Sequence, residues 1–246
     1  MEGILIIAAV TFILFLAAFV RSSLGFGDAV VAMPLLALVV DIKTATPVVA
    51  LFATTIAISI LLRNWQKTDL RATLHLVISS LLGIPLGLLI VKNLPEVILK
   101  VILGSIILLY GIYRFFKPGL KLKKDIPIVS FLFGFIAGIL GGAYNTNGPP
   151  VVIYGTLRHW TPENFRATMQ GYFLPTGLLI TISHGVTGLW TSVVFKHYIV
   201  ALPFVLLAVF LGGKFHHAAG AERFDRYVNS AIVLMGLLLI LRVLFT

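Results

Sequence analysis

The chain contains no cysteine and few charged residues: 19 Lys and Arg and 9 Asp and Glu among 246 residues, or 11%. The absence of cysteine excludes disulfides, thiolate metal sites and cysteine nucleophiles. A soluble domain carries about 25% charged residues, so the hydrophobic 59% of this chain cannot all be buried in one globular core. The composition therefore indicates an integral membrane protein.

Acidic residues are the scarcer class of charge, and the formal net charge is +10. The Lys and Arg residues stand between apolar runs, so they indicate membrane orientation and not a nucleic-acid surface. At about 20 apolar residues for each transmembrane helix, the chain has room for about eight to ten spanning elements and no sizeable soluble domain. An intramembrane hydrolase needs a nucleophile or a carboxylate pair backed by a base. The apolar segments offer one acid, so we do not expect an enzyme.

Stretches free of Asp, Glu, Lys and Arg locate the membrane elements, because an unpaired charge at the bilayer centre costs several kcal/mol. These stretches are Gly3 to Val20, Thr44 to Leu62, Ala72 to Val91, Val101 to Tyr113, Ile126 to Leu157, Ala167 to Phe195, His197 to Gly213 and Tyr227 to Leu241. The chain starts Met1-Glu2-Gly3, without a basic region, so we expect the first run to be a retained helix and not a cleaved signal peptide.

Two segments interrupt this pattern. The first is Arg21-Ser-Ser-Leu-Gly-Phe-Gly-Asp28, before a short apolar stretch that ends at Asp41. The second is Gly141-Gly-Ala-Tyr-Asn-Thr-Asn-Gly-Pro-Pro150, before a short stretch that ends at Leu157. Gly, Pro and Asn at this density break a helix, and broken backbone is tolerated at membrane depth only where protein or a water-filled cavity covers it. Both breaks are therefore candidate walls of a cavity.

Matching residues near the two breaks predict an internal repeat. Offsets of 116 separate Gly25 from Gly141 and Pro34 from Pro150, and offsets of 125 separate Gly87 from Gly212 and Gly111 from Gly236. Chance matches among many glycines are the alternative. Each half holds one long helix, one short broken segment and three more helices, and this odd number makes the halves enter the membrane from opposite sides.

We therefore expect an all-α polytopic membrane protein with two inverted repeats of about five elements, comprising eight full transmembrane helices and two short broken or re-entrant helices. The first repeat covers residues 1–116, a basic linker covers 117–125, and the second repeat covers 126–246. With the amino terminus outside, 14 of the 19 Lys and Arg fall on the side of this linker, Arg21 among them, and five fall on the other side. Because basic residues collect on the cytoplasmic side, we predict a cytoplasmic linker and both termini outside.

The short segments after the breaks predict an anion site. As helices they would be about 20 Å and about 15 Å long, too short for a hydrocarbon core of about 30 Å. If they are anchored at opposite surfaces, both begin near the membrane middle, where free N–H groups and positive dipole ends favour an anion. The predicted substrate-binding residues are Arg21, Ser22, Ser23, Gly25, Gly27, Tyr144, Asn145, Thr146, Asn147, Gly148, Gln170 and Tyr172.

Structural roles are the alternative for several of these residues. Single Ser and Asn residues cap helices, and single glycines let helices pack closely; Gln170 and Tyr172 are as consistent with packing as with the cavity. Asn145 and Asn147 together favour a site, because two amides in a broken membrane helix need partners. Asp28 is either the carrier of a coupling proton or the ion-pair partner of Arg21.

We predict no metal site and no cofactor, because neither carboxylates nor a second histidine recur at ligand spacing on a membrane helix. His75 and His184 stand near predicted helix ends, where we expect interfacial hydrogen bonds.

The segments at the breaks resemble a known family. Leu24-Gly-Phe-Gly-Asp-Ala-Val-Val-Ala-Met-Pro-Leu-Leu36 is similar to the glycine-rich signature near the start of the sulfite exporter TauE/SafE family of membrane permeases. The segments Gly148-Pro-Pro-Val-Val-Ile-Tyr-Gly155, Trp160-Thr-Pro-Glu-Asn-Phe-Arg-Ala-Thr168 and Gln170-Gly-Tyr-Phe173 resemble its second repeat. The resemblance implies movement of sulfite, sulfonates, sulfoacetate and related anions across the bacterial inner membrane, usually as export. One departure is Asp28-Ala29, where many relatives continue with glycines.

From the residues and the resemblance together, we expect a secondary transporter, an exporter of small sulfur-containing anions that works by alternating access. Its expected partners are the small anion, the lipid bilayer and a coupling proton, with no nucleic acid; glycine-rich helix faces permit a homodimer. An anion channel, or a membrane subunit that binds a partner protein without transporting, is the alternative.

Overall fold

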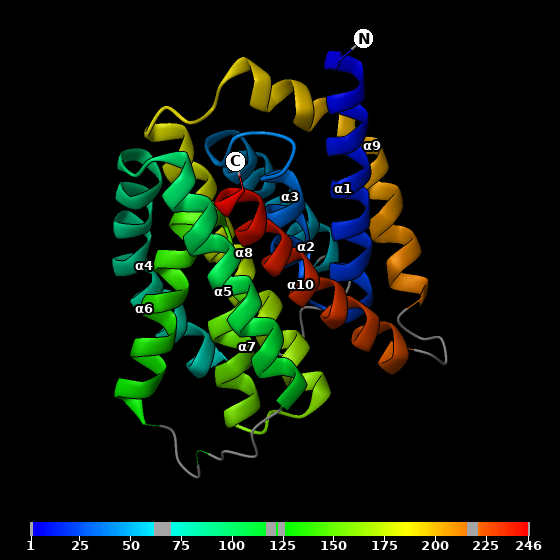
Figure 1. Cartoon of the computed structure of the whole chain (residues 1–246). Helices are drawn as coiled ribbons and strands as arrows, with labels where there is room; N and C mark the ends of the chain where they lie inside the picture. The colour runs from blue at the N-terminus through cyan, green and yellow to red at the C-terminus, as the bar shows by residue number, and fades with distance from the viewer. Residues whose placement is uncertain (1, 62–69, 117–121, 123–125, 216–220, 246) are drawn as a thin grey trace.

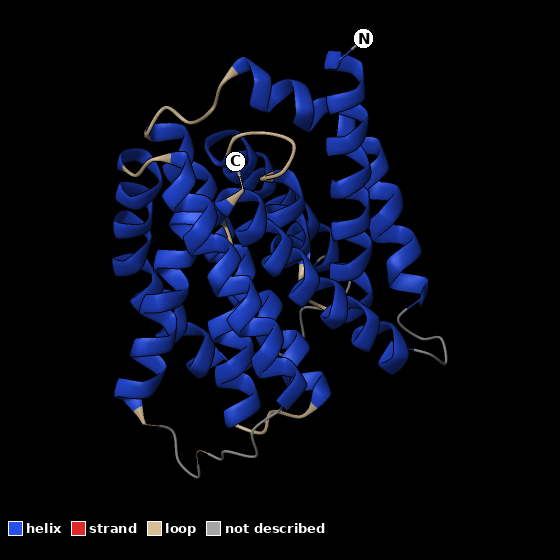
Figure 2. Cartoon of the chain, viewed as in Figure 1, coloured by secondary structure: helices blue, strands red, loops and turns tan. Residues whose placement is uncertain are grey.

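The computed structural model describes the chain except residues 1, 62–69, 117–121, 123–125, 216–220 and 246. Every regular element in the described part is a helix, joined by short turns (Figure 2). The predicted linker, residues 117–125, lies outside the described residues apart from Leu122. The helices are α1 Glu2–Leu24, α2 Asp28–Leu36, α3 Ile42–Leu61, α4 Leu70–Asn93, α5 Glu96–Phe116, α6 Pro127–Tyr144, α7 Gly148–Leu157, α8 Pro162–Val186, α9 Ser192–Phe215 and α10 Ala221–Leu244.

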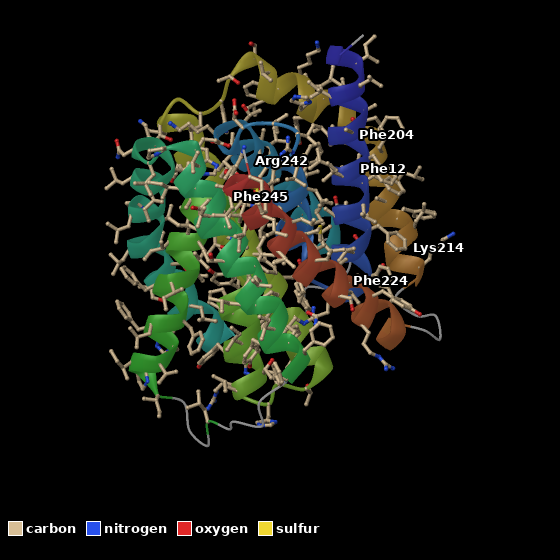
Figure 3. The ribbon with its side chains drawn as sticks, in the orientation of Figure 1. Phe12, Phe204, Lys214, Phe224, Arg242 and Phe245 are labelled. Atoms are coloured by element: carbon tan, nitrogen blue, oxygen red, sulfur yellow. The ribbon has the colours of Figure 1, made fainter. Side chains whose placement is uncertain are left out.

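Helix length and apolarity identify a multi-pass membrane protein. Among the described residues, seven helices are long and apolar enough to cross a membrane: α1, α3, α4, α5, α6, α9 and α10. Helix α8 has 25 residues but carries polar side chains such as Asn164, Gln170 and His184, which lower its hydropathy. Large apolar side chains cover the outside of the bundle, and Figure 3 shows Phe12, Phe204 and Phe245 pointing outward. Such a surface is stable in lipid and not in water.

Close helix pairs hold the bundle together. Helix α4 lies along α6 and α1 lies along α9, on opposite sides of the molecule (Figure 1), while α5 packs on α10 and α3 on α8. A Cβ atom added to Gly138 would overlap the backbone of Ser80, and one added to Gly83 would overlap the backbone of Phe135. Small residues let membrane helices approach until their backbones touch, so these glycines set the α4–α6 distance.

The two short helices point to opposite ends of the bundle. At the far end of α2, Leu38 O accepts a hydrogen bond from Arg242 Nη1 at 2.7 Å, near the carboxyl end of α10. At the far end of α7, Leu157 O accepts from the backbone N–H of Leu122 at 2.9 Å, between α5 and α6. Helix α10 ends toward the top of Figure 1, whereas α5 ends and α6 begins at the bottom. Both short helices therefore have their amino ends inside the bundle.

The helix boundaries recur at an offset of 120 residues and not at 116. Helices α1 and α6 end at Leu24 and Tyr144, and α2 and α7 begin at Asp28 and Gly148. Gly25 follows the end of α1, whereas Gly141, 116 residues later, lies within α6. The glycine pair that predicted the offset therefore does not mark matching helix positions.

Candidate functional site

The first break brings opposite charges together. Helix α1 ends at Leu24 and α2 begins at Asp28, and Gly25 and Gly27 turn the chain with φ angles of 88° and 103°. Residues with a side chain rarely adopt such angles, whereas glycine does so readily. The turn places Arg21 Nη1 2.6 Å from Asp28 Oδ2, so the two side chains form an ion pair across the break.

Arg21 is almost completely buried, with 1% of its surface exposed. Besides Asp28, its guanidinium donates to Ala53 O at 3.2 Å and to Gln170 Oε1 at 3.5 Å, and it lies 4.7 Å from the centroid of the Phe173 ring. A charge removed from water must be compensated by partners of this kind. Arg21 was counted on the linker side and also predicted at the anion site; its side chain lies within the bundle, at the first break.

Gln170 of α8 connects this cation to the broken backbone. Its Nε2 donates to Gly25 O at 2.8 Å, while its Oε1 accepts from Arg21. One amide therefore fixes both the guanidinium and the loop between α1 and α2. The structure thus brings three of the predicted residues together, Gln170, Arg21 and Gly25.

The second break contains the two amides. Asn145 follows α6 with a φ of 52°, and Asn147 precedes α7 without a side-chain cap hydrogen bond. Asn147 Nδ2 donates to Thr176 Oγ1 of α8 at 3.2 Å. Thr146 donates to Tyr144 O at 3.1 Å, so its hydroxyl closes the helix end.

Side chains from other helices also saturate the carboxyl end of α6. Gly142 O lies 3.1 Å from His184 Nε2, and Ala143 O accepts from Thr46 Oγ1 at 3.3 Å. The last carbonyls of a helix have no partner within the helix, so these contacts fix the second break. From its position near a predicted helix end, His184 was expected to make an interfacial hydrogen bond. Instead it is fully buried, because the end of α8 that carries it packs inside the bundle.

Phe173 of α8 joins the two breaks. Its ring lies under the Arg21 guanidinium, and a Cβ atom added to Gly148 would lie 3.5 Å from the same ring. Gln170, Phe173 and Thr176 are three residues apart, the spacing of one helix face. Phe173 and Thr176 were not among the predicted residues, because their spacing from Gln170 points to them only once Gln170 is known to lie in the site.

The other predicted residues divide between this centre and contacts elsewhere. Ser23 Oγ donates to Gly212 O of α9 at 3.4 Å, away from Arg21. The Tyr172 hydroxyl lies 2.8 Å from Ser80 Oγ of α4 and also hydrogen-bonds Asn147 and Thr176, so it belongs to the second break. The hydroxyls of Ser22 and Tyr144 are buried and have no hydrogen-bond partner within the described structure. Ser22 lies on the α9 side like Ser23, since a Cβ atom added to Gly212 would meet the Ser22 Cβ at 2.8 Å.

The charges at the breaks determine what they can bind. The Arg21 guanidinium and the first N–H groups of α2 are donors for an anion. Helix α7 contributes fewer donors, because Pro149 and Pro150 in its first turn lack N–H groups. The Asp28 carboxylate already forms an ion pair with the Arg21 guanidinium, so an anion must compete with that carboxylate. No cluster of three or more His, Asp or Glu residues suited to a metal occurs in the described ranges.

Comparison with known proteins adds independent information. The model of the family described as sulfite exporter TauE/SafE matches residues 10–239. Over 153 residues the chain is 26% identical to a Cupriavidus necator protein named "Probable sulfite/organosulfonate exporter TauE". That match covers 61% of this chain and 60% of the relative, less than two thirds of the relative's length. No solved structure matches the chain.

Proposed function

Since this chain belongs to the sulfite exporter TauE/SafE family, a family of membrane transporters and not of enzymes, we propose that it exports small sulfur-containing anions such as sulfite, sulfonates or sulfoacetate. The seven apolar helices and the family place it in the bacterial inner membrane as a multi-pass protein. The name of the Cupriavidus necator relative supports the choice of anion.

The observation that carries the proposal is the buried Arg21 guanidinium where two broken helices meet α8. An ionisable group inside a membrane protein is costly and marks a substrate or ion pathway. The oxygen atoms of a sulfonate or of sulfite can accept two parallel hydrogen bonds from the N–H groups of a guanidinium. We assign Arg21, Gly25, Gln170, Asn145, Asn147 and Gly148 to anion contact, with Phe173 as an apolar wall between the breaks.

Asp28 supplies the coupling in this proposal. In the anion-free state its carboxylate neutralises Arg21 at 2.6 Å. Protonation of Asp28 removes its charge and releases the guanidinium to the substrate, so one proton and one negative charge bind together. The buried site then stays neutral in both states, which avoids an uncompensated charge at membrane depth.

Alternating access requires two halves that can move against each other, and we propose that they are inverted repeats with α8 as the eighth span. In such a repeat each helix of α1–α5 corresponds to the helix five places later, in α6–α10. The α1–α9 pair then corresponds to the α6–α4 pair, and the α3–α9 pair corresponds to the α8–α4 pair. All four pairs are in contact. The opposite directions of α2 and α7 support the inversion. The cytoplasmic position of the linker and of Leu157 follows from the basic residues.

Counterflow in proteoliposomes tests the proposal. Vesicles that contain purified protein are loaded with unlabelled sulfite or an organosulfonate, and uptake of labelled anion is followed. A carrier accumulates label transiently and saturates, whereas a channel does neither. Flux absent with every anion tried, from protein shown to be folded, would contradict transport and favour a partner-binding subunit.

A further inference from the structure

A second arginine–phenylalanine pair lies beside the first break. The guanidinium of Arg114, in the last turn of α5, lies 5.2 Å from the centroid of the Phe26 ring and 6.0 Å from that of Tyr110. Phe26 is the residue between Gly25 and Gly27, so it belongs to the loop that forms the break. The loop is thus flanked by two arginines, Arg21 on its helix side and Arg114 beyond the Phe26 ring.

Phe26 lies on the side of the site that faces the carboxyl end of α5. Its buried ring packs edge to face on Phe165 at 5.9 Å, in the first turn of α8. Arg21 contacts α8 further along, at Gln170 and Phe173. The five to eight residues between these positions on α8 correspond to about 8 to 12 Å along the helix. The Phe26 ring therefore separates Arg21 from the end of the bundle where α5 ends and α8 begins.

The anchors of the two breaks differ. The second break is fixed by His184 and Thr46, which bind the end of α6 and contact no predicted substrate group in the described structure. The loop of the first break is held by Gln170 at Gly25 O, and Gln170 also binds Arg21. A ligand that binds Arg21 therefore perturbs an anchor of the Phe26 loop, and the positive φ angles at Gly25 and Gly27 give that loop hinges.

We propose that Phe26 is the cytoplasmic gate of the anion site and that Arg114 holds it closed. An anion that arrives from the cytoplasm pairs with the Arg114 guanidinium, which weakens its hold on the ring and lets Phe26 swing away. The guanidinium–ring attraction is strong enough to bias the gate and weak enough to be reversed by one anion. This inference rests on the proposed function for the side from which the anion enters.

The natural absence of cysteine makes the gate measurable by thiol labelling. Gly148→Cys puts a reporter at the amino end of α7, where an added Cβ atom meets Phe173 at ordinary contact distance and the helix end favours the reactive thiolate. The probe is the impermeant sulfonatoethyl methanethiosulfonate, applied to the cytoplasmic face in inverted vesicles and to the outer face in right-side-out vesicles. Labelling does not depend on transport, so a failed counterflow experiment and a failed gate are distinguishable.

In the Gly148→Cys background, Phe26→Ala should raise the labelling rate from the cytoplasmic face about tenfold or more and leave the outer-face rate unchanged. Phe26→Leu keeps an apolar side chain but removes the aromatic ring that the Arg114 guanidinium contacts. It should therefore act like Arg114→Gln, and both variants should raise the labelling rate from the cytoplasmic face by less than Phe26→Ala does. Phe133→Ala, which removes an equal side chain from α6 outside the break, is the matched control. Acceleration from the outer face, or unchanged labelling in folded Phe26→Leu and Arg114→Gln, would overturn the proposal.

Discussion

The Arg21 guanidinium and the Asp28 carboxylate, seven residues apart in sequence, meet at 2.6 Å across a break in a membrane helix. Each residue stands on a different helix, and the turn through Gly25 and Gly27 folds one back onto the other. The pair buries a guanidinium whose charge is neutralised by the Asp28 carboxylate. In the proposed function, stability and anion recognition therefore depend on the same contact.

Asp28→Asn should remove the pH dependence of anion binding. In the native protein, binding should strengthen as the pH falls, because protonation of Asp28 frees Arg21; asparagine cannot titrate. Counterflow of an organosulfonate, whose charge is constant across this range, is measured from acidic to neutral pH. The variant must be folded, as shown by a single elution peak. A pH dependence that persists in it would assign Asp28 to structure alone.

Arg21→Gln should both abolish saturable uptake and destabilise the fold by about 3–5 kcal/mol, because it leaves a buried carboxylate without a partner. Adding Asp28→Asn should recover much of that stability while uptake stays absent. Thermal unfolding in detergent of the two single variants and the double variant completes a double-mutant cycle. Additive effects of the two substitutions would show that the ion pair does not couple the two residues.

Asn147→Ala should weaken substrate binding about tenfold without unfolding the protein, since it removes an amide from the second break and one hydrogen bond to Thr176. Asn145 needs two variants because its φ is 52°. Asn145→Gly removes the amide without strain, whereas Asn145→Ala adds about 1–2 kcal/mol of backbone strain. Binding is measured by calorimetry on purified protein. Unchanged affinity in Asn147→Ala and Asn145→Gly would place the anion elsewhere.

His184→Ala should lower the free energy of unfolding by about 1–3 kcal/mol, because the buried carbonyl of Gly142 loses its partner. Substrate affinity should change less than stability, since His184 holds the helix end and is not among the residues assigned to anion contact. His75→Ala is the control, because the His75 side chain, near the start of α4, is only partly buried. Equal melting temperatures for the two variants would refute the anchoring role.

Several features could be predicted from the sequence because each depends on local chemistry. The two breaks follow from Gly, Pro and Asn in apolar surroundings, and the structure confirms helix ends at Leu24 and Tyr144 within the predicted segments. The offset of 116 was wrong for these breaks, since matching glycines in a glycine-rich chain need not occupy matching turns. The contacts of Phe173 and Thr176 were missed because an apolar ring and a hydroxyl on a helix carry no signal until their neighbours are known.

By itself, the sequence determined that this protein lies in a membrane, where its helices run and where they break, because lipid excludes charge and unsatisfied backbone wherever they occur along the chain. Only the tertiary structure decided which polar groups meet. Arg21 joins Asp28, Ala53 and Gln170, while Ser23 turns to α9. The physical reason is that a buried polar group must find partners, and those partners come from segments as far as 189 residues away.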